Sequence, residues 1–327
     1  MNVLKTGTKE GCGHGGCGSC TVMISKYIHD NDQLVHYTVN ACLFPLCAVH
    51  GLAITTVEGV GNPNTGLHDI QKRMVQSHAL QCGYCTPGFV MSAFALLRNN
   101  PNPTRDEVER AFEGNLCRCT GYRPILAAFD SLTKEGCPMG EQCCKKFQTT
   151  EQGTQEVSSD NSCSSNIDST QVPIFPPELK THGDYRLSRC FKGLKWNWYS
   201  PTSLQELLDL KAKYPMAPVI MGNTTAALSI KLGKFNTSSV LLYGGNITDI
   251  SDVVVVNGGI ELGAAVTVSQ LRHKLSNMEN TISGRLYKYN TFCSGNCSFH
   301  NILLEQSLLM ECMYCFGVIR TTFDIFI

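Results

Sequence analysis

The chain has 327 residues, enough for two or three domains of ordinary size. Lysine plus arginine and aspartate plus glutamate number 27 each, and this balance argues against a nucleic-acid partner and against electrostatic membrane binding. The 18 cysteines are the anomaly. Since the sequence shows neither a signal-peptide pattern nor an apolar run of membrane-spanning length, we expect a cytoplasmic chain whose clustered cysteines bind metal.

The first cysteine group lies in and after the glycine-rich stretch GCGHGGCGSC. Its spacing, C-x4-C-x2-C with a fourth cysteine about twenty residues later, is the plant-type [2Fe–2S] spacing. Glycines let such a loop wrap tightly and point its amide groups at the cluster sulfurs. A flexible loop with incidental cysteines is the alternative, and His14 is expected to be a solvated side chain rather than a spare ligand. The group consists of Cys12, Cys17, Cys20 and Cys42.

The second cysteine group follows as a C-x2-C pair in QCGYCTPGF and a C-x-C pair in NLCRCTGYRP. The surrounding sequence predicts four short helices with the cysteines at their ends. Spacing leaves both an iron–sulfur cluster and a zinc ion open as occupants of these thiols. The group consists of Cys82, Cys85, Cys117 and Cys119.

The helix boundaries can be predicted from local patterns. Thr86 and Pro87 are expected at the N-cap and first position of the second helix, which should stop before Pro101. Thr104 and Glu107 form a capping-box pattern that opens the third, and ILAAFDSL follows as the fourth. The first helix lies in LHDIQKRMVQSHAL, with one apolar face formed by Leu67, Ile70, Met74 and Val75.

Residues 137–178 are rich in serine, threonine and charged residues and predict a disordered linker, whose Cys137, Cys143 and Cys144 are expected to be solvated. Globular patterning then resumes with predicted strands and a leucine-rich helix. Within it a short buried strand is followed by GNTT, a pattern whose free amide groups and hydroxyl suit a pyrophosphate. A plain strand-to-turn boundary is the alternative.

The stretches GCGHGGCGSCTVMISKY, NACLFPLC, TTVEGVG, QCGYCTPGFVMS and GNLCRCTGYRPI together resemble the xanthine dehydrogenase and aldehyde oxidase family of molybdo-flavoenzymes. KYPMAPVIMGNT is similar to the start of that family's FAD domain. Its sequence is closer to aldehyde oxidase than to xanthine dehydrogenase. The resemblance covers about residues 6–272. It implies an α+β multidomain chain with a β-grasp ferredoxin-like domain, a helical-bundle [2Fe–2S] domain, a disordered linker, part of an α/β FAD-binding domain of the PCMH type and a non-family tail, over residues 1–60, 61–136, 137–190, 191–276 and 277–327.

The resemblance also assigns cofactors. It places a ferredoxin-like cluster on the first cysteine group and a helical cluster on the second, with Gln81 touching the molybdopterin that lies beside the helical cluster in the family. The resemblance further implies that electrons run from molybdenum through the helical cluster and then the ferredoxin-like cluster to FAD. The sequence departs from the family's FAD-domain pattern at Ala227, where the family usually has glycine. The expected FAD contacts are Val219, Ile220, Met221, Gly222, Asn223, Thr224, Thr225 and Ala226.

Both ends depart from the family pattern. Only MNVLK precedes GTKEGCG where the family has a β-hairpin, so the first cluster is expected to be poorly held, and the pattern stops near residues 268–271. We expect a truncated or alternatively spliced product, or a faulty gene model. The tail has Cys293, Cys297, Cys312 and Cys315 at zinc-ribbon spacing, but its apolar sequence favours an aggregation-prone end or a surface that needs a partner.

These observations predict the electron-transfer portion of an aldehyde oxidase-like oxidoreductase. The molybdenum domain is not in the sequence, so we expect no catalytic residue and no substrate oxidation by this chain alone, with FAD bound weakly or not at all. Because the resemblance implies homodimers, the expected partner is a second copy or a full-length relative. The alternatives are a non-catalytic truncated isoform that pairs with the full-length enzyme, or a zinc-thiolate protein.

Overall fold

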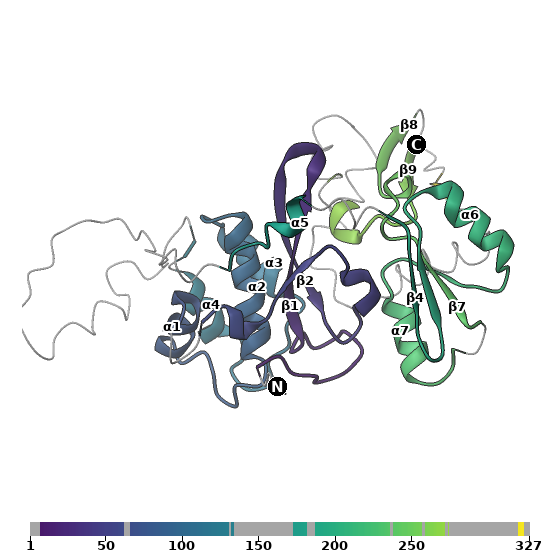
Figure 1. Ribbon diagram of the computed structural model, residues 1–327. Coiled ribbons are helices and arrows are strands. Elements are labelled where there is room, and N and C mark those ends of the chain that lie inside the picture. Colours follow the sequence, from purple (N-terminus) through teal and green to yellow (C-terminus); the bar gives the residue numbers. More distant parts are fainter. Residues whose placement is uncertain are drawn as a thin grey trace, which may run out of the picture. The chain divides into compact units, whose positions relative to one another are not determined.

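The computed structural model describes residues 7–61, 66–130, 132–133, 173–181, 187–235, 238–256, 259–271, 274 and 320–323. The chain is an α+β protein that divides into two compact units, Met1–Asp184 and Tyr185–Ile327 (Figure 1). In the described part of the chain, no helix is long and apolar enough to cross a membrane. The cysteines of the expected linker and those of the tail lie outside the described residues.

The first unit contains an antiparallel sheet of order β2-β1-β3. β1 and β2 form a hairpin through the short 3-10 turn η1 (His29–Asn31) and pair along their whole length. The first five residues of β1 are all buried, which requires cover on both faces because successive side chains point to opposite sides of a strand. The strands are β1 (Thr21–Ile28), β2 (Gln33–Asn40) and β3 (Ala53–Thr55), and the 3-10 turns η2 (Leu46–Val49) and η3 (Val57–Gly59) flank β3.

Four helices complete this part of the unit, as predicted. In the first, Ile70 and Met74 are fully buried, but Val75 is 54% exposed. The expected apolar face was therefore too wide: Ile70 and Met74, four residues apart, share a face, whereas Val75 is rotated by a further 100°. The helices are α1 (Asp69–Gln76), α2 (Thr86–Asn99), α3 (Arg105–Phe112) and α4 (Arg123–Asp130).

The start of α2 differs from the prediction by one residue. Thr86 is the first helical residue and Cys85 is the N-cap. The Cys85 carbonyl already accepts hydrogen bonds from the amides of Gly88 and Phe89, at 3.0 and 3.4 Å, so the helical ladder begins at a candidate ligand. The helix ends at Asn99, and its C-cap Asn100 directly precedes Pro101, so the helix stops before this proline as expected.

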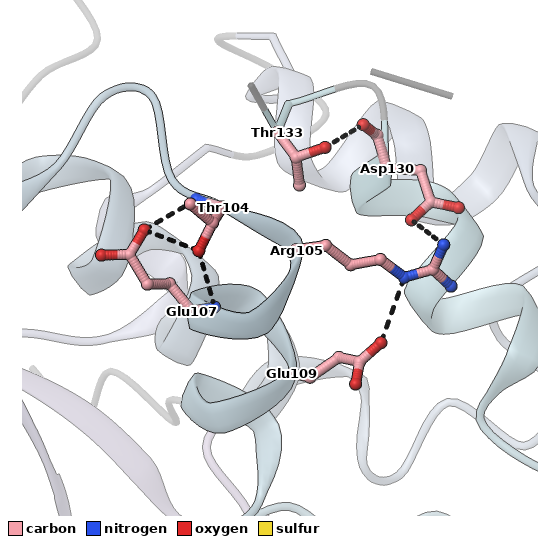
Figure 2. A network of polar contacts seen from close by, with 6 residues as sticks. All are labelled: Thr104, Arg105, Glu107, Glu109, Asp130 and Thr133. Carbon is pink, nitrogen blue, oxygen red and sulfur yellow. Dashed lines mark hydrogen bonds and ion pairs between the residues drawn. The ribbon is translucent and has the colours of Figure 1, made fainter. Parts of the chain in front are cut away.

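The capping box of α3 is confirmed (Figure 2). The Glu107 amide donates to Thr104 Oγ1 at 3.2 Å, and the Thr104 amide donates to Glu107 Oε2 at 2.7 Å. Arg105 then contacts Glu109 one turn later and reaches the largely buried Asp130 at 3.8 Å. These contacts fix the start of α3 and tie it to the end of α4.

Sheet and helices share one hydrophobic core. Met23 of β1 packs in the same cluster of buried residues as Phe89, Phe112 and Phe129. The rings of Phe112 and Phe129 meet edge to face at 4.9 Å. A polar clamp lies at the other end of α2, where the Asn99 side chain accepts from the His36 amide at 3.1 Å and donates to the His36 carbonyl at 2.6 Å. The two candidate cysteine regions are therefore parts of one packed unit.

Part of the expected linker contacts the tip of the β1–β2 hairpin. α5 (Glu178–Thr181) lies beside that tip (Figure 1). Lys180 Nζ lies 5.3 Å from the centre of the Tyr27 ring, and the Phe175 ring lies 6.5 Å from that of Tyr27. The segment 173–181 is thus held against the hairpin by aromatic and cation–π contacts.

The second unit is built on a sheet of order β4-β5-β7-β6. β5, β7 and β6 are parallel, so their carboxyl ends meet at one edge of the sheet. Leu207 of α6 is fully buried in the core, whereas its neighbour Leu208 is 42% exposed. The elements are β4 (Arg189–Lys192), β5 (Asn197–Ser200), α6 (Leu204–Lys213), β6 (Val219–Ile220), α7 (Thr224–Lys231) and β7 (Val240–Tyr243).

A second, antiparallel sheet of order β10-β9-β8 follows the turn η8 (Thr248–Ile250) in the same unit. Arg320–Phe323 of the tail is its outer strand β10, paired with β9. The other strands are β8 (Val253–Val256) and β9 (Gly259–Gly263).

Candidate functional site

The first cysteine group lies in the loop that precedes β1 and at the end of β2. Gly13, Gly15 and Gly18 have positive φ angles of 71°, 81° and 71°. Because residues with a side chain rarely adopt this conformation, the glycines permit the tight course of the loop. His14 is exposed in the same loop, in line with its expected role as a solvated side chain.

Ser19 holds this loop closed. Its hydroxyl accepts a hydrogen bond from the Gly11 amide and donates one to the Lys9 carbonyl, each at 3.1 Å. The same oxygen lies 3.2 Å from Cys17 Sγ. Ser19 was not predicted from the sequence, although a hydroxyl two positions after a cysteine in a metal-binding loop is a signal for such a role.

The thiols of the first group lie close to one another. Cys17 interacts with Cys12, and Cys20 interacts most strongly with Cys42 and also with Cys17. Burial raises the pKa of Cys17, but hydrogen bonds from Ser19 and Cys12 outweigh this and lower it to about 7. Burial raises the pKa of Cys20 to about 11. Since thiolates are the metal ligands, binding of a metal here releases protons, above all from Cys20.

The thiols of the second group also lie close to one another. Cys82 and Cys119, which we call the outer pair, are exposed, and their sulfur atoms are 3.6 Å apart. Cys85 and Cys117, the inner pair, interact with each other and are half-buried and buried. Burial raises the pKa of Cys85 to about 12. Gln81, beside the outer pair, is exposed.

Neighbouring hydroxyl groups support the inner pair. Thr120 Oγ1 lies 3.1 Å from Cys117 Sγ, and the Thr120 amide donates to the same sulfur at 3.4 Å. The Tyr122 hydroxyl accepts from the Cys117 amide at 3.1 Å. Amide hydrogen bonds of this kind to sulfur tune a bound cluster.

The separation of the outer pair can be compared with that of two thiolates on one metal. Two thiolates bound to one tetrahedral metal at about 2.3 Å lie about 3.7 Å apart, which matches the outer pair. Two iron atoms that each take two cysteines suit this arrangement, so both groups fit a [2Fe–2S] cluster.

The two cysteine groups are joined by two hydrogen bonds, one between backbone groups and one from a side chain to the backbone. The Leu116 amide donates to the carbonyl of Cys17 at 2.9 Å, and Leu116 directly precedes Cys117. Tyr84, between Cys82 and Cys85, donates from its hydroxyl to the Glu10 carbonyl at 3.0 Å. A candidate ligand of one group is therefore one hydrogen bond and one peptide unit from a candidate ligand of the other.

The second unit carries a loop of a different kind at the carboxyl end of β6. Asn223 has a φ of 63°, and the N-terminus of α7 behind it has no side-chain cap. Thr224 is exposed, and a side-chain carbon added at Gly222 would meet open space. Amide groups at a helix N-terminus without a side-chain cap can donate hydrogen bonds to a phosphate group.

The residues proposed for this loop are thus brought together, with Ile220 buried in the strand and Val219, Met221 and Ala226 partly buried around it. Thr225 is exposed, like Thr224. Ala227 is buried in the first turn of α7, where its amide donates to the Asn223 carbonyl at 3.0 Å. Its methyl group therefore packs inward.

Three family models match the chain. Residues 2–47 match the 2Fe-2S iron-sulfur cluster binding domain, and residues 56–130 match the [2Fe-2S] binding domain. Residues 191–288 match the FAD binding domain in molybdopterin dehydrogenase. The chain therefore carries two iron–sulfur domains of the [2Fe–2S] type and an FAD-binding domain.

Two curated proteins and one solved structure illustrate what the chain is similar to. Aldehyde oxidase 1 of Cavia porcellus is 44% identical over 290 residues, 85% of this chain and 22% of the relative. Xanthine dehydrogenase of Calliphora vicina is 44% identical over 275 residues, 81% of this chain and 20% of the relative. The structure of quinoline 2-oxidoreductase from Pseudomonas putida 86 is 41% identical over 39% of this chain and 71% of that chain, with a TM-score of 0.33.

The chain spans about a fifth of the length of these curated relatives. Its matched domains follow the order of the motifs in its sequence, from the two iron–sulfur domains to the FAD-binding domain. The chain belongs to the aldehyde oxidase and xanthine dehydrogenase family and corresponds to the N-terminal region of its members.

Proposed function

We propose that this chain passes electrons through two [2Fe–2S] clusters toward FAD, as the electron-transfer portion of an oxidoreductase of the aldehyde oxidase type. The observation that carries the proposal is the hydrogen bond from the Leu116 amide to the Cys17 carbonyl, which connects the two cysteine groups. Each cluster supplies a site that accepts and releases one electron. The chain holds the two sites in one packed unit.

The proposed ligands are the eight paired thiols. Cys12 and Cys17 would bind one iron of the first cluster, and the second iron would take Cys20 with Cys42. For the second cluster, one iron would take the outer pair and the other the inner pair. This division rests on the pairing of the thiols and on the 3.6 Å sulfur separation in the outer pair.

Exposure of the thiols supports a direction of transfer. The outer pair is exposed, so an external donor can approach it, whereas Cys117 of the inner pair is buried next to Leu116 and the first cysteine loop. Clusters held by these thiols would be connected through Cys117, Leu116 and the Leu116–Cys17 hydrogen bond, which leads from the inner pair to the first group. In this proposal the donor is the molybdopterin of a full-length relative, and Gln81, which directly precedes Cys82, is exposed as well.

The acceptor in this proposal is FAD, held by the loop from Val219 to Ala226. Its uncapped helix N-terminus and the open space at Gly222 support a pyrophosphate contact there. The proposed domains are a β-grasp ferredoxin-like domain at 1–60, a helical cluster domain at 61–136 and a PCMH-type flavin domain from 191. The proposed partner is a second copy or a full-length relative in the cytoplasm.

The experiment is metal analysis and quantitative EPR of the anaerobically reduced protein. We expect about four irons per chain and two distinct [2Fe–2S] signals of about one spin each. Cys42→Ser should remove one signal and leave the other. Cys47→Ser is the matched control, because Cys47 lies five residues from Cys42 and belongs to neither group, and it should keep both signals.

Three results would refute the proposal. The first is zinc in place of iron, which would make the chain a zinc-thiolate protein. The second is a chain that contains no metal but pairs with the full-length enzyme, which would favour an interaction partner. The third is an equal effect of the Cys42 and Cys47 substitutions, which would show that the signals do not depend on the assigned ligands.

A further inference from the structure

Three residues that are not candidate ligands meet where the two cysteine loops touch. Gly18 belongs to the first loop, Gly88 to the first turn of α2, and Asn115 lies two residues before Cys117. A side-chain carbon added to Gly18 would collide with the Gly114 carbonyl oxygen and fall 2.7 Å from Asn115 Oδ1, and one added to Gly88 would fall 2.6 Å from the same Asn115 atom. Both distances are shorter than real side-chain carbons show, so neither glycine can carry a side chain while Asn115 keeps its place.

The backbones of the two loops are also in direct contact. A side-chain carbon on Gly88 would collide with the carbonyl oxygen of Gly18. That oxygen is held in place by Thr21, whose amide and hydroxyl donate to it at 3.1 and 2.6 Å. Moving this oxygen would break both hydrogen bonds. A larger residue at position 88 therefore has to push the first turn of α2 and the first cysteine loop apart.

Asn115 is fixed between these loops. It is only 7% exposed, its Nδ2 donates to the buried Ser92 hydroxyl at 2.8 Å, and its amide donates to the Phe112 carbonyl at 2.9 Å. Its Oδ1, in contrast, has no hydrogen-bond partner in the described part of the chain and points at the two glycines. A buried acceptor without a partner lowers stability. Stability alone therefore does not account for an amide oxygen at this position.

We propose that Asn115, seated against Gly18 and Gly88, is a positioning residue that sets the distance and electronic coupling between the two clusters. The inference rests on the proposed function and deepens it. Asn115 directly precedes Leu116 in the chain. It therefore acts through the hydrogen bond from the Leu116 amide to the Cys17 carbonyl. If the three-residue contact is opened, that hydrogen bond lengthens or breaks, and the two clusters separate while each keeps its own ligands.

The test is Gly88→Ala, with Gly114→Ala as its matched control. Gly114 is adjacent to Asn115, has no positive φ angle, and a side-chain carbon there meets nothing within 4 Å. Alanine favours a helix over glycine, so without the contact Gly88→Ala would be harmless. The measurement is the splitting of the two reduced EPR signals at low temperature, which reports the magnetic interaction between the clusters, together with the spin count of each.

We expect Gly88→Ala to keep both signals at full spin count and to lose the splitting, while Gly114→Ala keeps both signals and the splitting. A merely structural defect would lower the spin count instead. If Gly88→Ala does not assemble its clusters, Asn115→Ala, which removes the carboxamide without adding bulk, decides through the same loss of splitting. Unchanged splitting in the cluster-containing variant overturns the inference. If the unmodified protein lacks both signals, the proposed function is wrong and the inference falls with it. The two failures are distinguishable, because only this one affects the unmodified protein.

Discussion

The clamp between Asn99 and His36 should hold the end of α2 to the sheet. Asn99 lies 63 residues from His36, and its side chain bonds both the amide and the carbonyl of that residue. His36 is only 6% exposed, so water replaces these bonds poorly. Two such hydrogen bonds contribute about 2 kcal/mol, and alanine regains about 0.5 kcal/mol of helix propensity. Asn99→Ala should therefore lower the free energy of unfolding by about 1.5 kcal/mol.

Native-state hydrogen exchange tests the clamp at its own site. Asn99→Ala should remove the protection of the His36 amide, because its acceptor is gone. Asn99→Asp keeps an acceptor for that amide but places a second oxygen opposite the His36 carbonyl, so it should be destabilised while the amide stays protected. Asn102→Ala, in the exposed turn after α2, is the control and should change stability by less than about 0.5 kcal/mol. If the His36 amide stays protected in Asn99→Ala, the reasoning is wrong.

Two further predictions concern the core of the first unit. His68 is buried and caps α1 by accepting the Ile70 amide at Nδ1, and burial lowers its pKa. The pKa of this imidazole is lower in the folded than in the unfolded protein, where it is about 6.5. Its contribution to stability is therefore complete above pH 6.5 and is lost as the pH falls from there through the folded-state pKa. His68→Asn, which caps without titrating, should flatten the loss of stability below pH 6.5 in a pH series of denaturant titrations; an unchanged slope would contradict this. Phe89→Ala should cost about 3–5 kcal/mol, since Phe89 is fully buried, whereas Leu46→Ala should cost little because Leu46 is 85% exposed; equal thermal midpoints for the two variants would show that this ring does not anchor the core.

The local features of the first unit could be predicted from the sequence because they depend on residues close together in the chain. The capping box of Thr104 and Glu107 spans one turn, and the stop at Asn100 needs only the following proline. The placement of the second cysteine group at the ends of four helices followed from the same short-range patterns. The grouping of eight cysteines into two sets depends on spacing alone, and each set lies within the range of one family-model match.

Contacts between distant residues were decided by the tertiary structure. Nothing in the spacing indicates that Cys82 faces Cys119 or that Cys85 faces Cys117, and the choice between zinc and a binuclear cluster therefore stayed open. Val75 was assigned to the core by its chemistry, but the burial of Ile70 and Met74 turns it outward.

The junction of the two cysteine loops has the same origin. Leu116 meets Cys17, and Gly88 meets Gly18, only because the sheet and α2 share one core. The sequence alone determines which residues can bind metal and where the helices that carry them begin and end, since hydrogen-bond caps and side-chain periodicity act over a few residues. The distance between the two cysteine groups is determined by packing between segments about seventy to a hundred residues apart in the chain. Side-chain periodicity carries no information about such contacts.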